Sequence, residues 1–327
     1  MEAKCVKYYK YGRPENVLKI EKKHIQSPRA GEILVRMITR PINPSDIIPI
    51  YGSYSHRISL PMIPGYEGVG IVEEIGPSLS RELLGKRVLP LRGEGTWQDY
   101  VCSSAEWAIP IPNTIDDFTA AQLYINPVTA WAVCKEILQL QPSDTILVNA
   151  CGSAIGRIFA QLSKIFGFKL VAAVRNDIHT KELLELGASY VINTSKSSLA
   201  SEVRELTNGQ GITAVIDSIG GAHGTEMANC LKSNGTFLSI GLLSGKPIDW
   251  KIIANKATVK IFHLRHWNQQ VSVKTWQETF ERLISFSNEK KLKLMTPHTQ
   301  YDFMDVKEAI HATQSHEKKS GKVFLNN

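Results

Sequence analysis

The sequence has few cysteines, and they are scattered. The five are odd in number and show no C-x-x-C spacing: Cys5, Cys102, Cys134, Cys151 and Cys230. Disulfide frameworks use even, closely spaced sets in oxidising compartments, and zinc sites commonly pair cysteines at short spacing. We therefore expect reduced, mostly buried thiols and a cytoplasmic protein.

Long apolar runs are also missing. No stretch reaches the roughly 18 apolar residues that a membrane span requires. The N-terminal segment MEAKCVKYYKYG lacks the apolar core of a secretory signal. We therefore expect no membrane partner.

Positive charge is present but not concentrated. The formal net charge is +7, and the lysines and arginines are spread along the chain without a basic helix or an aromatic–basic repeat. Nucleic-acid-binding surfaces usually cluster their cations. The sequence therefore predicts no nucleic-acid partner and favours a basic surface around a phosphate-rich small molecule.

The most informative stretch of the 327 residues runs from Asp144 to Asn176. An apolar run, Ile146–Asn149, is followed by a turn of small residues and by helical spacing from Arg157 to Phe166. A second β-rich run, Leu170–Val174, comes after Gly167. Strand, turn, helix and strand make a βαβ unit with a right-handed crossover.

The turn in this unit has the chemistry of a phosphate-binding loop. Small residues let the backbone approach a diphosphate, and the start of the helix attracts its negative charge. The turn departs from the G-x-G-x-x-G fingerprint, because Cys151 and Ser153 hold the first two positions. We predict that a dinucleotide contacts Ser153, Ala154, Ile155 and Gly156.

The residues after the second strand indicate which dinucleotide is bound. A site for NAD usually carries an acidic residue about 20 residues beyond the glycines, whereas this chain has Arg175. An arginine suits the 2′-phosphate of NADP, and Lys181 can assist from the next helix. A solvated arginine is the alternative, and the nearby Asp177 leaves NAD open. The pattern favours NADPH.

Two patterns divide the chain. Residues 1 to about 120 form short β-like runs broken by glycine and proline, which suggests a partly closed antiparallel barrel. From about Thr119 strands and helices alternate as far as a strand at 235–240, followed by Gly241, and this predicts a doubly wound parallel sheet. An amphipathic helix at Val273–Asn288 and a last strand at 321–325 follow. We expect a catalytic domain at 1–118 and 268–327 and a nucleotide-binding domain at 119–267.

Four short motifs occur in the order typical of medium-chain dehydrogenases/reductases: Asn43–Asp46, Pro64–Gly70, Leu186–Ala188 and Ser320–Val323. The chain resembles that family over essentially its whole length. The resemblance implies an α/β fold, with a GroES-like, partly open β-barrel catalytic domain and a Rossmann domain. It also implies a homodimer.

Many members of this family hold a catalytic zinc through a cysteine and a histidine. The corresponding positions here are Asn43 and Tyr66, and the lobe with four closely spaced cysteines is missing. Zinc requires three or four cysteine, histidine or acidic ligands. We therefore expect no metal, and the chain resembles zinc-independent members rather than alcohol dehydrogenases.

Two zinc-independent branches compete, the 2-enoyl thioester reductases and the quinone oxidoreductases. The segment NPSDIIPIYGSY resembles the one that carries the catalytic tyrosine of the enoyl reductases, which would be Tyr54. Quinone reductases also carry a Gly-x-Tyr here, so Tyr54 alone does not separate the branches. After Phe262 the enoyl branch has a tryptophan, and this chain has His263.

The resemblance assigns roles to further residues. Tyr54 would protonate the substrate after hydride transfer, unless it is a packed loop tyrosine. Asn43 would bind the substrate or the ribose, unless it only caps a turn. Contacts to the cofactor would come from Asn126, Thr129 and Gly241, unless Thr129 only caps its helix. Contacts to the substrate would come from Trp97 and Phe262, unless Trp97 is simply buried in the core.

We therefore predict an NADPH-dependent oxidoreductase that reduces an activated C=C bond, with an enoyl thioester favoured over a quinone as its small-molecule substrate. A quinone reductase would need little help from an acid. A role from a different class, as a non-enzymatic NADPH sensor or a nucleic-acid-binding protein, would predict cofactor binding without turnover, or salt-dependent binding of nucleic acid.

Overall fold

The computed structural model describes residues 1–253, 257–314 and 321–327. Its backbone contacts divide it into two compact units. We call residues 1–125, 272–288 and 293–327 the barrel unit, and residues 126–271 and 289–292 the nucleotide unit. The predicted domain boundaries, at 118/119 and 267/268, stay a prediction. Ser320, the first residue of the fourth family motif, lies outside the described residues.

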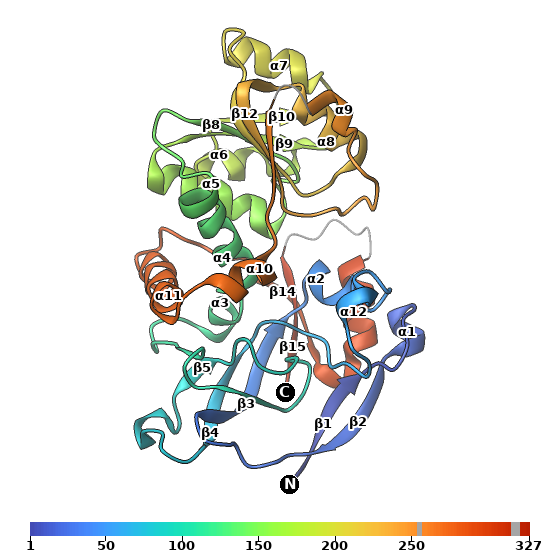
Figure 1. The fold of residues 1–327 in the computed structure, drawn as a ribbon, viewed down its shortest axis with the longest axis vertical. Coiled ribbons are helices and arrows are strands. Elements are labelled where there is room, and N and C mark those ends of the chain that lie inside the picture. The colour runs from blue at the N-terminus through green and yellow to red at the C-terminus, as the bar shows by residue number, and fades with distance from the viewer. Residues whose placement is uncertain (254–256, 315–320) are drawn as a thin grey trace. The chain divides into compact units, whose positions relative to one another are not determined.

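The barrel unit is built on a seven-stranded sheet (Figure 1). Its central strand, β3 (Glu32–Pro41), pairs antiparallel with β4 (Val69–Ile75) and, over successive halves, with β6 (Tyr100–Ser104) and β15 (Lys322–Asn326). The other strands are β5 (Arg87–Leu89), β7 (Ile109–Pro110) and β14 (Pro297–Asp302). Within residues 1–120 the pairings of this sheet are antiparallel, as predicted, whereas β14 and β15, from the last segment of the chain, pair parallel.

The last segment of the chain is more regular than predicted. Beyond the confirmed helix α11 (Val273–Asn288), the sequence suggested only short runs before the final strand, but the structure has β14 and a helix, α12 (Val306–Gln314). Helix α12 buries Val306, Ala309 and Ile310, which lie three and four residues apart on one face. That stripe is too short to stand out in the sequence.

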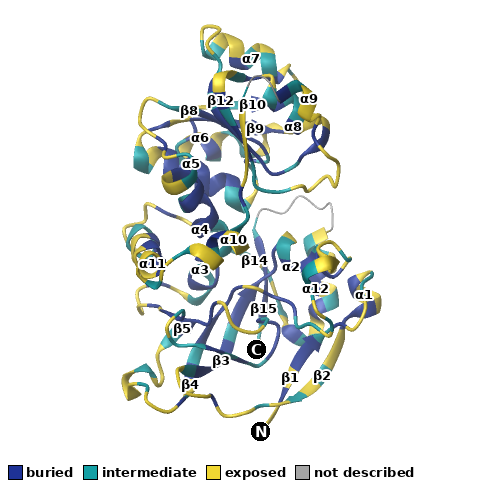
Figure 2. Cartoon of the chain, in the orientation of Figure 1, coloured by how far each residue is buried: buried dark blue, intermediate teal, exposed yellow. Residues whose placement is uncertain are grey.

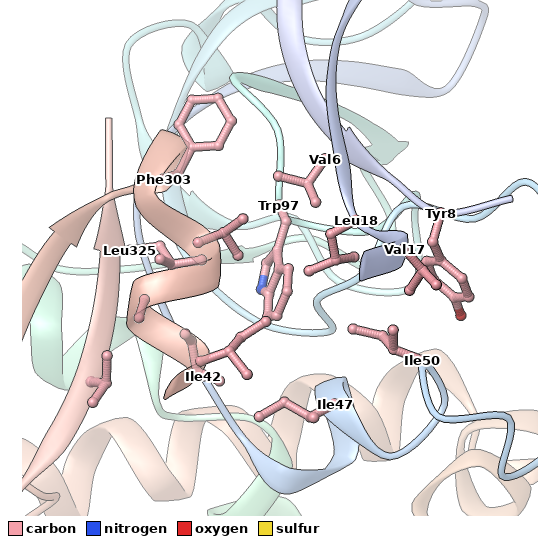
Figure 3. Close-up of a cluster of buried hydrophobic side chains, with 14 residues drawn as sticks. Val6, Tyr8, Val17, Leu18, Ile42, Ile47, Ile50, Trp97, Phe303 and Leu325 are labelled. Carbon is pink, nitrogen blue, oxygen red and sulfur yellow. The ribbon is translucent and has the colours of Figure 1, made fainter. Parts of the chain in front are cut away.

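The shorter elements of the barrel unit complete its outline. An antiparallel ribbon joins β1 (Glu2–Lys7) to β2 (Lys19–His24). The remaining α-helices are α1 (Pro14–Val17), α2 (Pro44–Ile47) and α3 (Asp117–Ala121), and the 3-10 turns are Ser55–Arg57, Arg81–Leu83 and Phe303–Asp305. Figure 3 shows the buried cluster that joins the ribbon, α2 and the C-terminal elements, with Trp97 among its members.

The nucleotide unit has a six-stranded parallel sheet in the order β10-β9-β8-β11-β12-β13. Its strands are β8 (Thr145–Val148), β9 (Lys169–Val174), β10 (Tyr190–Asn193), β11 (Ile212–Asp217), β12 (Leu231–Ser239) and β13 (Ala257–Ile261). The direction of strand order reverses between β8 and β11. Ligands of such sheets bind beyond the carboxyl ends of the strands at this reversal.

Helices cover both faces of this sheet. Successive residues of a strand point to opposite faces. Leu147, Val171 and Val215 pack in one cluster with residues of α7 (Leu199–Leu206), α8 (Gly221–Ala228) and α9 (Trp250–Ile253). The alternate positions Ile146, Val148 and Leu170 are equally buried, and Figure 2 colours the strands in the middle of this sheet mostly as buried. Helix α5 (Ala154–Phe166), which packs on β9, and α6 (Thr180–Leu186) lie outside that cluster. This confirms the doubly wound α/β fold.

Two helical segments of the nucleotide unit differ from expectation. The helical region near the start of the alternating pattern comprises α4 (Ile125–Ala132) and a π-helical stretch, Val133–Ile137, which was not predicted. Strand β13 and α10 (Leu264–Gln270) were not predicted. In the part of the chain that the structure describes, we find no helix long and apolar enough to cross a membrane.

Candidate active site

The small-residue turn leads directly into α5, as predicted. Ser153 is the N-cap of this helix, and its hydroxyl accepts a hydrogen bond from the Gly156 N–H at 3.3 Å. A Cβ at Gly156 would lie 2.4 Å from the Cα of Cys151, so only glycine fits. The N–H groups of Ala154 and Ile155 begin the helix, where backbone donors have no partner within the helix. The turn can therefore cradle a diphosphate.

The thiol inside the turn is not a nucleophile. Cys151 is fully buried, and its Sγ lies 3.2 Å from the Val148 carbonyl oxygen. Burial raises the pKa of this thiol to about 12, and the thiolate is the reactive form of cysteine. Cys151 therefore serves as a small side chain that fills the space beneath the turn.

Polar side chains connect β8 and β11 at their carboxyl ends. The amide of Asn149 donates to the Asp217 carboxylate at 2.5 Å, and its oxygen accepts from the Ser218 N–H at 2.9 Å. The Asp217 carboxylate also accepts from the Gly220 N–H at 3.1 Å. A Cβ at Gly241 would lie 3.1 Å from the Ser218 carbonyl oxygen. Asn149, Asp217 and Gly241 are therefore close together where the strand order reverses.

Arg175 follows β9 and is exposed. The acid that left NAD open, Asp177, is engaged elsewhere, because it accepts from Asn193 at 2.8 Å and from Lys196 at 2.5 Å. These bonds, with that from Lys196 the stronger influence, lower the pKa of Asp177. Lys181 has a side chain that is 92% exposed and pairs with Glu185 at 4.0 Å. Arg175 is therefore the better placed cation for a 2′-phosphate.

The other predicted cofactor and substrate residues of the nucleotide unit lie on α4 and directly after β13. Asn126 and Thr129 lie on α4, and Thr129 is buried. Phe262 follows β13, is buried, and donates its N–H to the Ser239 carbonyl at 2.9 Å. His263 is the N-cap of α10, where its Nδ1 accepts from the Arg265 N–H at 3.3 Å.

In the barrel unit, Tyr54 lies in an exposed loop with an unusual backbone. Its φ is 70°, in the left-handed region that few non-glycine residues adopt, and its side chain remains 37% exposed. The Arg57 guanidinium carbon lies 3.8 Å from the centre of the Tyr54 ring, within the range of a cation–π contact. Tyr54 is therefore partly exposed with Arg57 stacked on its ring, and its role as a proton donor stays a prediction.

Asn43 is part of a buried polar network rather than an exposed side chain. It is 2% exposed, and its amide donates to the Glu67 carboxylate at 2.8 Å. Its oxygen accepts a hydrogen bond from the Lys322 ammonium. The Asp46 carboxylate accepts from the N–H groups of Asn43 at 2.7 Å and Tyr66 at 3.1 Å. We call Asn43, Asp46, Glu67 and Lys322 the barrel network.

Burial changes the acidity of this network. It raises the pKa of Asp46 to about 7, and it also raises that of Glu67. Burial lowers the pKa of Lys322, although the two carboxylates oppose this effect. One signal of the barrel network is visible in the sequence, because Lys322 begins the otherwise apolar run 322–325. Asn43 as a ligand contact stays a prediction.

Trp97 is fully buried in the cluster of Figure 3. A Cβ at Gly65 would lie 2.4 Å from its Cδ1, so the indole packs on a bare backbone segment. The contact of Trp97 with a substrate stays a prediction. Among the described residues we find no group of three or more histidine, cysteine or acidic side chains that could hold a metal ion.

Two family models and several known proteins are similar to this chain. Residues 29–113 match the model of the alcohol dehydrogenase GroES-like domain, and residues 154–289 match that of the zinc-binding dehydrogenases. The chain is 33% identical to a mitochondrial enoyl-[acyl-carrier-protein] reductase of Xenopus tropicalis, over 76% of this chain and 72% of that protein. It is 30% identical to the rat protein of the same name, over 83% and 75%.

Solved structures of other proteins share this fold. A Bacillus thuringiensis protein described as a candidate NADPH:quinone reductase is 57% identical, with a TM-score of 0.98 over 100% of this chain and 99% of that one. The Escherichia coli quinone oxidoreductase, solved with NADPH, is 24% identical, with a TM-score of 0.90 over 99% and 100%, and shares the fold.

A GroES-like unit joined to a Rossmann-like unit defines an oxidoreductase fold. The chain belongs to the medium-chain dehydrogenase/reductase family, among relatives named enoyl reductases and quinone oxidoreductases.

Proposed function

We propose that this protein is an NADPH-dependent reductase that reduces the C=C bond of a 2-enoyl thioester. The choice of NADPH over NADH depends on the contrast between Arg175 and Asp177, which both follow β9. Arg175 is exposed, while Asp177 is engaged by Asn193 and Lys196. The resemblance to enoyl-[acyl-carrier-protein] reductases supports the substrate class.

The residues present fit this cofactor. The turn ending in Gly156 has the bare backbone that a diphosphate requires, and a guanidinium suits a phosphate through paired charge-assisted hydrogen bonds. NADPH supplies a hydride when bound. Ser153 and Gly156 would hold the diphosphate, and Arg175 the 2′-phosphate.

Tyr54 is the proposed acid. Hydride addition at the β-carbon of an enoyl thioester leaves negative charge on the thioester oxygen, and the α-carbon must then take a proton. The exposed Tyr54 phenol would donate that proton. Arg57 is stacked on its ring and keeps the phenol in place.

Quinone reduction is the second candidate, and one specific observation favours it. The 57% identical Bacillus thuringiensis protein is described as a candidate NADPH:quinone reductase. A quinone takes hydride onto a flat conjugated ring system, and its oxygens accept protons readily from water. A quinone reductase would therefore not depend on Tyr54.

The deciding experiment follows NADPH oxidation with crotonyl-CoA, a longer 2-enoyl-CoA and a simple quinone. For an enoyl reductase, Tyr54→Phe should lower kcat on enoyl-CoA about 10²–10⁴-fold. Tyr51→Phe is the matched control, because Tyr51 is a nearby tyrosine that is 46% exposed. Quinone turnover that survives Tyr54→Phe, without enoyl turnover, would favour the second candidate. NADPH binding without any turnover would favour a sensor.

A second experiment tests the cofactor. Arg175→Ser should weaken NADPH binding about 10–100-fold and leave NADH binding nearly unchanged, because one charged hydrogen-bonding group is worth about 1.5–3 kcal/mol. Arg204→Ser, at an exposed arginine of α7, is the control for loss of charge. Equal losses for NADPH and NADH would contradict the role of Arg175.

We also propose a cytoplasmic homodimer. Among the described strands, β13 has one neighbour, β12, so its other edge is unpaired, and Val259 and Ile261 on this strand are exposed. Unpaired edges with apolar side chains favour pairing with another strand. Ile261, at 76% exposed, is the residue to change. Light scattering should show that Ile261→Lys shifts a dimer to monomer, and a wild-type monomer would refute the proposal.

A further inference from the structure

Arg157 is a buried arginine in the first turn of α5, directly after the diphosphate turn. It is 8% exposed, and all three of its guanidinium nitrogens are engaged. Its Nε donates to the Gly152 carbonyl at 3.1 Å, one terminal nitrogen donates to the Glu182 carboxylate, and the other lies 3.1 Å from His179 Nδ1. Arginine is seldom buried unless it is paired in this way.

These partners come from two different segments. Gly152 belongs to the turn, whereas His179 ends a 3-10 turn, Asp177–His179, and Glu182 lies in the first turn of α6. That 3-10 turn begins two residues after Arg175. A single planar guanidinium therefore joins the turn proposed for the diphosphate to the segment that follows the residue proposed for the 2′-phosphate.

The contact leaves little space for adjustment. A Cβ at Gly152 would lie 2.6 Å from His179 Cδ2, so the imidazole packs directly against the turn. Burial, and secondarily Arg157, lowers the pKa of His179. A neutral imidazole can accept the hydrogen bond from Arg157, while Glu182 lies 3.6 Å from the same nitrogen. The arginine is thus held by one carboxylate, one imidazole and one backbone oxygen.

We propose that Arg157, braced by His179 and Glu182, is a positioning residue for NADPH. By holding the Gly152 carbonyl, it fixes the turn so that the first N–H groups of α5 face the diphosphate. Through its other two nitrogens, which contact Glu182 and His179, the guanidinium also fixes the distance from that turn to the segment after Arg175. This inference rests on the proposed function, because it assumes that the turn binds NADPH.

The experiment compares Arg157→Met and Arg157→Lys with Lys164→Met. Lys164 is exposed on the same helix, so its variant loses one charge without touching the turn. NADPH affinity is measured by cofactor fluorescence, and kcat at saturating NADPH with the substrate that the panel identifies. Arg157→Met should weaken NADPH binding about tenfold or more with little change in kcat, because three hydrogen bonds to a charged group are lost.

The two other variants complete the series. The NADPH affinity of Arg157→Lys should fall between those of Arg157→Met and the wild type, because an ammonium can replace at most one of the three guanidinium contacts. Lys164→Met should stay within about twofold of the wild type, as is usual for an exposed charge. Should Arg157→Met not fold, His179→Leu removes one arm and should still weaken NADPH binding.

A folded Arg157→Met that binds NADPH as tightly as Lys164→Met does would overturn the proposal. Amide hydrogen exchange of residues 150–156 without cofactor gives an independent result, because a lost brace should speed exchange in the turn while the strands of the sheet stay protected. If the wild type binds no NADPH, the proposed function fails, and unchanged exchange in Arg157→Met would then show that the brace itself is also absent.

Discussion

The two units hold their buried polar groups in different ways. In the nucleotide unit, Asn149 and Asp217 lie at the carboxyl ends of adjacent parallel strands, so Asn149 bonds Asp217 across the strand pair, and Asp217 also accepts from the Gly220 N–H three residues further on. In the barrel network, Asn43 bonds Glu67, 24 residues away, and Lys322, 279 residues away. The first arrangement follows from the order of the strands, and the second requires the whole unit to be folded. The first therefore depends on the pairing of two adjacent strands, and the second on compensation of charge.

The largest expected effect is loss of the one cation in the barrel network. Lys322→Met leaves Asp46 and Glu67 buried without the opposite charge, and removing one partner of a buried charge pair costs about 3–5 kcal/mol. Hydrogen exchange at β3 and β15 amides measures this unit by itself.

Two variants make this prediction specific. Lys22→Met, at a lysine with a side chain 74% exposed, should change stability by less than about 1 kcal/mol. Adding Glu67→Gln to Lys322→Met should recover part of the loss, because one buried carboxylate is then removed. Equal effects of Lys322→Met and Lys22→Met would show that compensation of charge is unimportant.

The nucleotide unit should lose less from its corresponding change. Asp217→Ala leaves the Asn149 amide and the Ile219 and Gly220 N–H groups without their acceptor. Unsatisfied buried donors cost about 1–3 kcal/mol. Asp217→Asn retains one acceptor oxygen and should cost less, as measured by hydrogen exchange at β8 and β11. A greater loss of stability in Asp217→Ala than in Lys322→Met would show that the nucleotide unit depends more strongly on its buried polar groups than the barrel unit does.

The same contrast explains what the sequence could predict. The strands and helices from β8 to β12 follow from local patterns, because each strand is a short apolar run bounded by turn residues. Ser153 and Gly156 were predicted correctly to form a tight turn into a helix, since that geometry involves adjacent residues. Strand β13 was missed because four of its five residues are exposed and give no apolar run.

The barrel network shows where prediction from sequence ends. Asn43 was predicted to contact a ligand and Glu67 was noted only within a family motif, and nothing in their spacing indicates that Lys322 reaches them. Antiparallel pairing of β15 with β3 brings the start of β15 close to the Asn43 segment, as the bond from the Ile42 N–H to the Val323 carbonyl shows. Arg157 was read as the start of a helix, and its brace depends on the packing of α6 against α5.

The pH dependence should also separate the two units. The pKa of Asp46 is about 7 in the folded state, well above its ordinary value of 3.8, so between roughly pH 4 and 7 the folded state binds a proton that the unfolded state has released. Stability of the barrel unit should therefore fall as pH rises through this window, by at most about 1.4 kcal/mol per pH unit for this group. Asp46→Asn should flatten that slope.

Asp177 in the nucleotide unit should act in the opposite direction. Its pKa is lowered, so its contribution is present above the ordinary pKa of an aspartate and is lost as pH falls. Urea unfolding between about pH 4.5 and 7.5 checks the sign for Asp46, and its extension to about pH 2.5 checks that for Asp177, with hydrogen exchange to assign each unit. A barrel unit that becomes more stable as pH rises across this range would contradict the raised pKa of Asp46.

The smallest expected effect concerns Lys181, a predicted cofactor contact. Its ammonium is exposed and pairs with Glu185 one helical turn away, and such pairs contribute about 0.3–0.5 kcal/mol. Lys181→Ala should therefore leave the stability of the nucleotide unit almost unchanged, as measured by thermal unfolding. Its NADPH affinity should fall much less than that of Arg175→Ser, because a mobile ammonium lacks the paired geometry of a guanidinium. A loss equal to that of Arg175→Ser would make Lys181 an equal partner in binding the 2′-phosphate, and electrostatic attraction over the whole surface would then outweigh the local geometry of the strand end.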